Sequence, residues 1–276
     1  MLSGKKILIV GSGPSSFAFL KAIINKQECE IDLIDSSFIE LFENQECVFK
    51  NQFEGSRMPI NKKHLDQDLL ISDHFGGFST FWGGTFDNPS GEIIDKYFDL
   101  DIDLKTYLKK IDEIIPQINR IDNVKHDNLK SSVIKRRTLK KFINEGFTIK
   151  DSNIAVSAKT LTLKKQNKKK CKYCKGYEWS CKPDTIWNSR FFIKQLINQN
   201  QINYSEDSTL ISFKEAENKV ICKVKIGNNV TEKKYDKLIV ACGPAGTSKI
   251  FLKSKLFEEV VIDSSDLIQI PFIKLF

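Results

Sequence analysis

The sequence predicts an α/β fold with a parallel β-sheet, and three separated apolar runs carry this prediction. The first run spans residues 6–10, the second spans residues 31–34 and ends at Asp35, and the third spans residues 238–242. Short continuous runs of this kind are typical of strands buried on both faces of a parallel sheet. Ligands of open α/β sheets bind at the carboxyl ends of such strands, so we expect the functional residues there.

The first thirty-five residues predict a βαβ unit whose first turn has the pattern G-x-G-x-x-S. Gly11 permits the tight turn after the first strand, and Gly13 lets the backbone approach a pyrophosphate at a helix N-terminus. Asp35 ends the second strand, where a carboxylate accepts hydrogen bonds from the ribose hydroxyls of an adenosine. The unit therefore predicts a dinucleotide bound by Gly11, Gly13, Pro14, Ser15, Ser16 and Asp35.

Ser16 occupies the position where this pattern usually has a third glycine, which allows close packing of helix on strand. Serine is one heavy atom larger than the alanine that the pattern also accepts. We therefore expect a slightly wider crossing of helix and strand. The alternative is a plain glycine turn without a ligand, and the strand–helix–strand context argues against it.

The composition is that of a folded protein with a full core. Of the 276 residues, 41% are hydrophobic and 28% are charged, which is ordinary for a soluble domain. No apolar run approaches the ~20 residues of a membrane span, and the first strand follows Met1 too closely to leave room for a signal peptide. Seven cysteines, an odd number, do not indicate a disulfide framework. We therefore expect a cytoplasmic protein without a membrane span.

The net charge of +8 raises the question of an anionic partner. The excess lies in basic runs at residues 135–137, 140–141 and 164–175. No pattern of aromatic side chains suited to stacking on bases accompanies these runs. We interpret them as solvated loops and expect no nucleic-acid partner.

A second informative stretch lies at residues 73–84. Four glycines within the nine positions 76–84 are incompatible with a regular helix or strand. Glycine takes positive φ and lets a flat ligand lie against the backbone, and neighbouring hydroxyls add hydrogen-bond donors. The alternative is a glycine-rich connector at the surface. The candidate binding residues of this stretch are Gly76, Gly77, Ser79, Thr80, Trp82, Gly83 and Gly84.

Together, the G-x-G-P-x-S turn at 11–16 and the G-G-F-S-x-x-W-G-G stretch at 76–84 resemble the flavin-binding half of the glucose–methanol–choline (GMC) oxidoreductases. The bacterial branch often associated with polysaccharide biosynthesis is the most similar. The resemblance implies FAD as cofactor, held by an FAD/NAD(P)-binding Rossmann-like fold, with residues 76–84 beside the flavin and its pyrophosphate. NAD(P) in the first turn is an alternative that this second stretch argues against.

Residues 90–189 are predicted to form an insertion that is largely helical. Apolar residues recur near helical spacing between Tyr97 and Ile115, and residues 131–145 predict a further, basic helix. Apolar stripes of this kind usually face a core, so we assign them no chemistry.

Three cysteines of this insertion raise the question of a metal. Cys171 and Cys174 have the spacing C-x2-C, and Cys181 follows six residues after the second of them. Closed zinc sites and four-thiolate iron–sulfur sites need four ligands, and no histidine lies nearby. We therefore predict no metal, and a zinc-stabilised basic module that binds nucleic acid stays open as an alternative. The GMC-like branch has a comparable cysteine-rich stretch followed by a segment that residues 186–189 resemble.

Residues 190–276 predict the second part of the cofactor-binding domain. We expect a helix at 190–198 and then a three-stranded meander, with strands at 210–213 and 219–226 and a hairpin turn at 227–229. After the last parallel strand, a glycine marks a sharp turn toward a helix expected at 249–256. The resemblance implies that the backbone at Leu210 and Ile211 passes the adenine, and that the turn at Cys242 and Gly243 passes the ribose and phosphates of the flavin.

The expected domains are cofactor-binding parts at 1–89 and 190–276 and the insertion at 90–189. The resemblance covers nearly all of this chain but only the N-terminal half of the family, whose catalytic histidine lies near its C-terminus. We therefore expect a truncated substrate domain, which a second polypeptide could complete. His74 is the histidine nearest the predicted flavin, and we expect it to be structural, so no catalytic residue is assigned.

The resemblance implies an FAD-dependent oxidoreductase that oxidises a CH–OH group of an alcohol or sugar by hydride transfer to the flavin. The sugar follows from the branch alone, which is an argument by analogy. A flavin- or nucleotide-binding fragment without catalysis is the alternative within the same fold.

Overall fold

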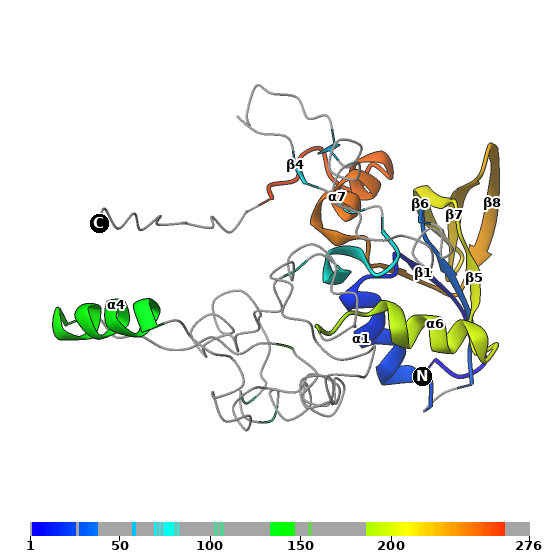
Figure 1. Ribbon diagram of the computed structural model, residues 1–276. Helices are drawn as coiled ribbons and strands as arrows, with labels where there is room; N and C mark the ends of the chain where they lie inside the picture. The colour runs from blue at the N-terminus through cyan, green and yellow to red at the C-terminus, as the bar shows by residue number, and fades with distance from the viewer. Residues whose placement is uncertain are drawn as a thin grey trace.

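The computed structural model describes residues 2–25, 28–37, 57–58, 69–70, 72, 74–80, 82, 103, 106, 133–146, 155 and 186–262. These ranges contain a parallel sheet, a three-stranded antiparallel sheet and the helices around them (Figure 1). No helix within them is long and apolar enough to cross a membrane.

The parallel sheet confirms the strands predicted from the apolar runs. Its order is β5-β2-β1-β9, with the bounds β1 Lys6–Val10, β2 Glu30–Ile34, β5 Asn203–Ser205 and β9 Lys237–Val240. Val10 of the central strand pairs with Ile34 on one side and with Val240 on the other. The three strands thus end level with one another, and we call this end of the sheet the carboxyl edge. The segments that follow the strands start side by side there.

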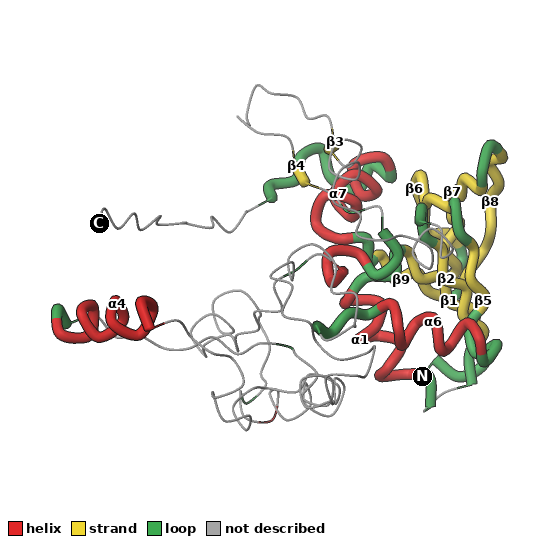
Figure 2. Tube along the Cα trace, viewed as in Figure 1, coloured by secondary structure: helices red, strands yellow, loops and turns green. Residues whose placement is uncertain are grey.

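Two helices cover one face of the sheet, α1 (Pro14–Ile23) and α6 (Arg190–Asn198). Side chains alternate across a strand, so Ile7 and Ile9 of β1 point to this face. They pack with Phe17 and Leu20 of α1 and with Ile193 of α6, all of which are almost completely buried. Figure 2 shows these two helices beside the group of strands. The helix predicted at 190–198 is therefore confirmed.

The predicted meander covers the opposite face. Its strands are β6 (Ser208–Ala216), β7 (Lys219–Ile226) and β8 (Asn229–Tyr235), paired antiparallel in sequence order. Leu8, on the other side of β1 from Ile7, packs with Leu210, Cys222 and Val224 of the meander. The meander connects β5 to β9, which are both strands of the parallel sheet. This arrangement is consistent with the predicted Rossmann-like fold with a meander crossover.

The last helix begins earlier than the sequence indicated. We predicted a helix at 249–256, whereas α7 spans Gly243–Lys253. The glycine–proline pair at 243–244 looks like a break in a helix, but proline fits the first turn, where its missing N–H has no partner to lose.

Other described elements are short or isolated. α4 (Val133–Asn144) confirms the basic helix predicted at 131–145, while most of the insertion lies outside the described residues. A two-stranded pair joins β3 (Arg57–Met58) to β4 (Leu69–Leu70), and a 3₁₀ helix, η2, spans Gly77–Thr80. The three domain boundaries stay predictions.

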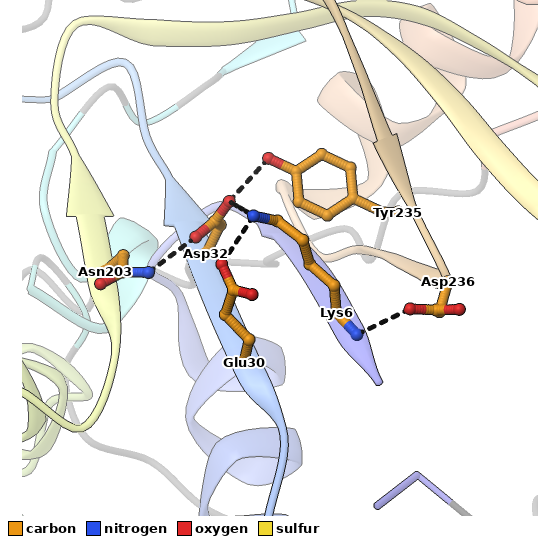
Figure 3. A network of polar contacts seen from close by, with 6 residues as sticks. All are labelled: Lys6, Glu30, Asp32, Asn203, Tyr235 and Asp236. Carbon is orange, nitrogen blue, oxygen red and sulfur yellow. Dashed lines mark hydrogen bonds and ion pairs between the residues drawn. The ribbon is translucent and has the colours of Figure 1, made fainter. Parts of the chain in front are cut away.

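A polar network ties the sheet together near the amino ends of its strands (Figure 3). Asp32 accepts hydrogen bonds from the Tyr235 hydroxyl (2.8 Å) and from the side-chain amide of Asn203 (3.0 Å). The Lys6 ammonium lies 2.6 Å from Glu30 and 3.8 Å from Asp32, and the hydrogen bond with Glu30 is the main reason that the pKa of Lys6 is raised. We call this the amino-end network; its members are Lys6, Glu30, Asp32, Asn203, Tyr235 and Asp236.

Candidate functional site

Three turns contain the predicted glycines, and we call them the glycine bends: the first at Gly11, the second at Gly76 and Gly77, and the third at Cys242 and Gly243. The first and third bends touch each other at the carboxyl edge. Gly11 follows β1 with a φ of +96°, which strongly favours glycine. A Cβ on Gly11 would lie 2.6 Å from the carbonyl oxygen of Ala241 and 3.0 Å from the Cα of Cys242. Only the absence of a side chain lets these two backbones approach so closely. A glycine is therefore required at the point where the turn after β1 meets the turn after β9.

The glycine-rich stretch docks on the same turn from another direction. Gly76 and Gly77 both have positive φ (+97° and +58°). The N–H of Gly76 donates a 2.8 Å hydrogen bond to the hydroxyl of Ser12, and a Cβ on Gly77 would lie 3.3 Å from the Cα of Gly13. Three glycine bends that are far apart in sequence thus meet in one place.

Two glycines at this meeting point face open space. A Cβ on Gly13 or on Gly243 would meet no atom within 4 Å among the contacts that the structure describes. Gly13 has an ordinary φ of −73°, so its backbone conformation does not require glycine. The absence of a side chain at Gly13 instead leaves room for a ligand to lie against the backbone, as the G-x-G pattern predicts.

The N-termini of two helices face this open space. α1 starts after Gly13 and α7 starts after Cys242, and neither helix has a side-chain cap or an acidic residue in its first turn. Their first-turn N–H groups and the positive ends of their dipoles therefore remain available to an anion. Ser15 of α1 and Gly243 and Thr247 of α7 line one cavity of about 570 Å³. This donor set fits a pyrophosphate, so the residues present fit a dinucleotide such as FAD.

Ser16, which replaces the third glycine, is fully buried. Its hydroxyl donates a hydrogen bond to the carbonyl oxygen of Gly11. The polar atom that distinguishes serine from alanine is thus satisfied inside the turn, so the departure does not disrupt it. The expected widening of the helix–strand crossing stays a prediction.

Asp35 lies at the end of β2, as predicted, and is only 8% exposed. One carboxylate oxygen accepts hydrogen bonds from the N–H (2.9 Å) and the hydroxyl (2.6 Å) of Ser37. Within the described part of the chain, the other carboxylate oxygen has no such bond, so it remains available to a ribose hydroxyl. The backbone carbonyl of Asp35 accepts a 2.8 Å hydrogen bond from the N–H of Ser208, which brings the start of β6 to this position.

The predicted adenine contact at Leu210 and Ile211 coincides with an irregularity in the meander. Leu210 pairs with Val224 and Ser212 pairs with Lys223, so Ile211 lies outside the ladder as a bulge. The Leu210 side chain is 1% exposed and belongs to the core. Any contact of Leu210 with a ligand must therefore use its backbone, and the bulge leaves the backbone of Ile211 without a ladder partner.

Three buried serines join the bends, and we call them the hydroxyl cluster: Ser12, Ser79 and Ser189. The Ser189 hydroxyl donates to the carbonyl oxygen of Ser12 (2.9 Å), and the Ser189 N–H donates to the Ser79 hydroxyl (3.1 Å). Serine at a helix N-cap usually bonds to the first turn of its own helix, but Ser189 at the start of α6 makes no such bond. Its hydroxyl is instead used to hold the turn after β1.

Ser12 and Ser189 were not among the predicted site residues. Ser189 lies in the 186–189 segment, whose resemblance to the GMC-like branch was noted without a role. The only available signal was therefore that resemblance, because single serines carry no periodicity or spacing of their own.

The remaining predicted residues of the glycine-rich stretch divide into described and undescribed ones. Thr80 donates to the carbonyl oxygen of Gly77 (2.8 Å), and the indole N–H of Trp82 donates to the carbonyl oxygen of Trp187 (2.8 Å). Gly83 and Gly84 lie outside the described residues. Thr80 and Trp82 therefore hold the stretch in shape, and a contact of either with a ligand stays a prediction.

Two titratable groups lie near the carboxyl edge. Burial lowers the pKa of His74 to about 4, so its imidazole is neutral at neutral pH and is a weak base. Burial raises the pKa of the Cys242 thiol, whose sulfur lies 3.7 Å from the Thr247 hydroxyl. These shifts favour the uncharged imidazole and the uncharged thiol, and we assign neither group a catalytic role.

The predicted absence of a metal is not tested. Cys171, Cys174 and Cys181 lie outside the described residues, and no group of three or more potential metal ligands occurs within them.

The parallel sheet, the glycine turn after β1 and the meander crossover together form an α/β fold of the FAD/NAD(P)-binding Rossmann-like kind. A solved structure of this kind agrees: pyridoxine 4-oxidase from Mesorbium loti matches 91% of this chain with a TM-score of 0.58 and 10% sequence identity. An identity this low shows the fold alone. The chain spans about half of that protein, 52% of its length.

A second match, to an ornithine hydroxylase from Pseudomonas aeruginosa, covers 88% of this chain and 37% of that one at 12% identity. Its TM-score of 0.27 is too low to support an argument. No protein-family model and no curated protein matches the chain.

Proposed function

We propose that the chain binds FAD at the carboxyl edge and forms the cofactor-binding part of an oxidoreductase. The contact between the three glycine bends carries this proposal. Gly11 lies against Ala241, and Gly77 lies against Gly13, so one elongated ligand can touch every bend. Had these bends been far apart, no single dinucleotide could have bridged them.

The order of the strands gives the direction of the bound dinucleotide. Asp35 ends β2, the glycine turn and the N-terminus of α1 follow β1, and Gly243 follows β9. Because β1 lies between β2 and β9, the adenosine half extends toward Asp35 and the bulge at Ile211. The pyrophosphate lies at the first turn of α1, and the flavin half extends toward the cavity lined by Ser15 and Gly243.

The residues of this chain bind and orient the cofactor. The first-turn N–H groups of α1 meet the pyrophosphate, and the Asp35 carboxylate oxygen that no described residue bonds accepts a hydrogen bond from a ribose hydroxyl. When bound, FAD supplies the capacity to accept a hydride from a carbon that carries a hydroxyl. The GMC resemblance implies such a CH–OH substrate, and the sugar or polysaccharide precursor rests on its polysaccharide-associated branch alone.

The group that takes the proton of the substrate hydroxyl is not among the residues that this site brings together. Of the three histidines the structure describes His74, and its lowered pKa makes it a poor proton acceptor. We infer that further residues complete the substrate side, either from parts of this chain outside the described residues or from a second polypeptide.

Reconstitution with FAD tests the binding part of the proposal. The purified chain, titrated with FAD, should quench flavin fluorescence at one equivalent and should give a resolved flavin absorption spectrum. Gly13→Val supplies the sharpest variant, because its side chain enters the open space at an ordinary φ. FAD binding should be lost while the melting temperature of the ligand-free protein stays within about 3 °C, an effect of less than 1 kcal/mol.

Anaerobic mixing of the FAD-loaded chain with alcohols and sugars tests the catalytic part. Bleaching of the flavin band would support oxidation of a CH–OH group. Stable flavin binding without bleaching by any alcohol or sugar would favour the non-catalytic alternative. A chain that binds no FAD would overturn the proposed function as a whole.

A further inference from the structure

One buried acceptor near the hydroxyl cluster has no hydrogen-bond partner in the part of the chain that the structure describes. The side-chain oxygen of Asn188 has no hydrogen bond among the described residues, and Asn188 as a whole is only 7% exposed. A buried amide oxygen without a partner destabilises a fold, and native proteins pair nearly all such atoms. An unpaired buried acceptor therefore indicates that a bound ligand supplies the missing hydrogen-bond donor.

The neighbours of Asn188 place its backbone beside the proposed cofactor site. Its neighbour Ser189 is hydrogen-bonded to Ser12 and Ser79, one from the turn after β1 and one from the glycine-rich stretch. Consecutive Cα atoms are about 3.8 Å apart, so the Asn188 backbone is held next to this cluster. On its other side, the carbonyl oxygen of Trp187 accepts the indole N–H of Trp82.

The backbone N–H groups of the two neighbours of Asn188 are paired, in contrast to the side-chain oxygen of Asn188. The N–H of Trp187 donates to Ala155 (2.9 Å), and the Ser189 N–H donates to Ser79 (3.1 Å). The backbone at Asn188 is thus held on both sides. An unpaired acceptor on a held backbone has fewer conformations to lose when a ligand donates a hydrogen bond to it.

We propose that Asn188 is a cofactor-contacting residue whose side-chain oxygen accepts a hydrogen bond from the bound dinucleotide. This inference rests on the proposed function. The donor is a hydroxyl or an N–H of the ligand, and the adenosine and flavin halves of FAD both carry such groups. Binding would satisfy the acceptor, so the ligand-free chain carries a penalty that the loaded chain does not.

Asn188→Leu tests this because it removes the acceptor at similar side-chain volume. Without an orphan polar atom, the melting temperature of the ligand-free variant should rise by about 2–4 °C. Its affinity for FAD should nevertheless fall about three- to tenfold, the effect of one lost hydrogen bond. A residue that served only the fold would change both quantities in the same direction or leave FAD binding unaltered.

Asn198→Leu serves as the matched control, because Asn198 is exposed at the C-terminal end of α6. It should leave the affinity for FAD within twofold of the wild type. Asn188→Ala provides a second variant if leucine prevents folding, and it should show the same loss of affinity.

Titration with ADP identifies the half of the ligand that donates. Weaker binding of both FAD and ADP would assign the donor to the adenosine diphosphate half, and weaker binding of FAD alone would assign it to the flavin half. Either result supports the proposal. Wild-type FAD binding that both Asn188 variants leave unchanged would overturn this inference and leave the proposed function intact, whereas a wild-type chain that binds no FAD would overturn both.

Discussion

The two ends of the parallel sheet are built in opposite ways. At the amino end, charged and polar side chains find partners within the fold: Asp32 accepts from Tyr235 and Asn203, and Lys6 contacts Glu30. At the carboxyl edge, side chains are missing or unsatisfied, as Gly13, Gly243 and Asn188 show. Protein groups satisfy one another at the amino end, while among the described residues the carboxyl edge keeps backbone donors and the acceptor oxygens of Asp35 and Asn188 available.

Because of this contrast, we expect substitutions that lower stability and substitutions that weaken ligand binding to lie at different ends of the sheet. Changes at the amino end should lower stability without altering the affinity for a ligand, because they lie away from the open space. Changes at the carboxyl edge should alter the affinity, and they should alter stability only where the bends themselves touch. The following experiments test that division, starting with the largest expected effect.

Gly11→Ala should have the largest effect, because it should lower both the free energy of unfolding and the affinity for FAD. The added Cβ would lie 2.6 Å from the carbonyl oxygen of Ala241, at a φ of +96°. We expect a loss of roughly 3 kcal/mol in the free energy of unfolding, measured by urea denaturation, together with loss of FAD binding. Gly4→Ala is the matched control, since Gly4 also has positive φ (+70°) but no atom within 4 Å of its Cβ position. An equal loss in both variants would show that backbone strain alone is responsible.

Asp32→Ala should lower stability without changing affinity. It leaves the Tyr235 hydroxyl without its acceptor, and Tyr235 is 1% exposed. We expect a loss of about 2 kcal/mol in the free energy of unfolding, the cost of leaving a buried donor unsatisfied. The dissociation constant for FAD should stay within twofold of the wild type. A tenfold change in that constant would contradict the separation of the two ends.

The pH dependence of stability should distinguish the two ends as well. Burial lowers the pKa of His74 from 6.5 to about 4, so protonation favours the unfolded chain. Stability should be complete above pH 6.5 and should fall between pH 6.5 and 4, by about 1–2 kcal/mol after allowing for screening at a partly exposed ring. In the amino-end network, the hydrogen bond from Lys219 and others lower the pKa of Asp236, so its contribution is lost only below about its ordinary 3.8.

Thermal unfolding of wild type and of His74→Gln, measured from pH 7.5 to 3, checks this. The variant should lose the decline between pH 6.5 and 4 and keep the decline below it. An unchanged profile would assign the first decline to other groups.

Ser189→Ala should have the smallest effect, and it tests the hydroxyl cluster. Removal of the hydroxyl breaks its bond to Ser12 and loosens the turn after β1. We expect about fivefold weaker FAD binding, near 1 kcal/mol, measured by fluorescence titration. Ser254→Ala is a matched control, because the Ser254 hydroxyl bonds Phe213 and Ile250 between β6 and α7. The Ser254→Ala variant should lower the free energy of unfolding by about 1 kcal/mol, the effect of one lost hydrogen bond, and should leave FAD binding unchanged.

The sequence was sufficient for three of the four strands of the parallel sheet, because buried parallel strands have a strong signature, whereas β5 (Asn203–Ser205) is short and polar and was not predicted. The apolar runs at 6–10 and 31–34 matched β1 and β2 closely, and the level ends of these strands explain why the distant glycines meet. The start of α7 was wrong by six residues, because glycine and proline at 243–244 resemble a break and here begin a helix.

The finer contacts of the site lay beyond the sequence for a different reason. The bonds of Ser189 reach Ser12 and Ser79 across 177 and 110 residues, and no local pattern encodes such a pairing. The orphan oxygen of Asn188 is likewise a property of its surroundings in space. Serine and asparagine are common at turns, so their identities alone gave no indication of these roles.

The pairing of the central strand has a consequence for how the protein folds. β1 pairs with β9, and the N–H of Lys6 bonds Asp236 across 230 residues of chain. During synthesis, one side of this apolar strand must therefore wait unpaired until nearly the whole described sequence has left the ribosome. Long-range pairing of this kind slows folding and exposes an aggregation-prone strand. We accordingly expect chaperone dependence and slow refolding, with the cofactor pocket among the last features to form.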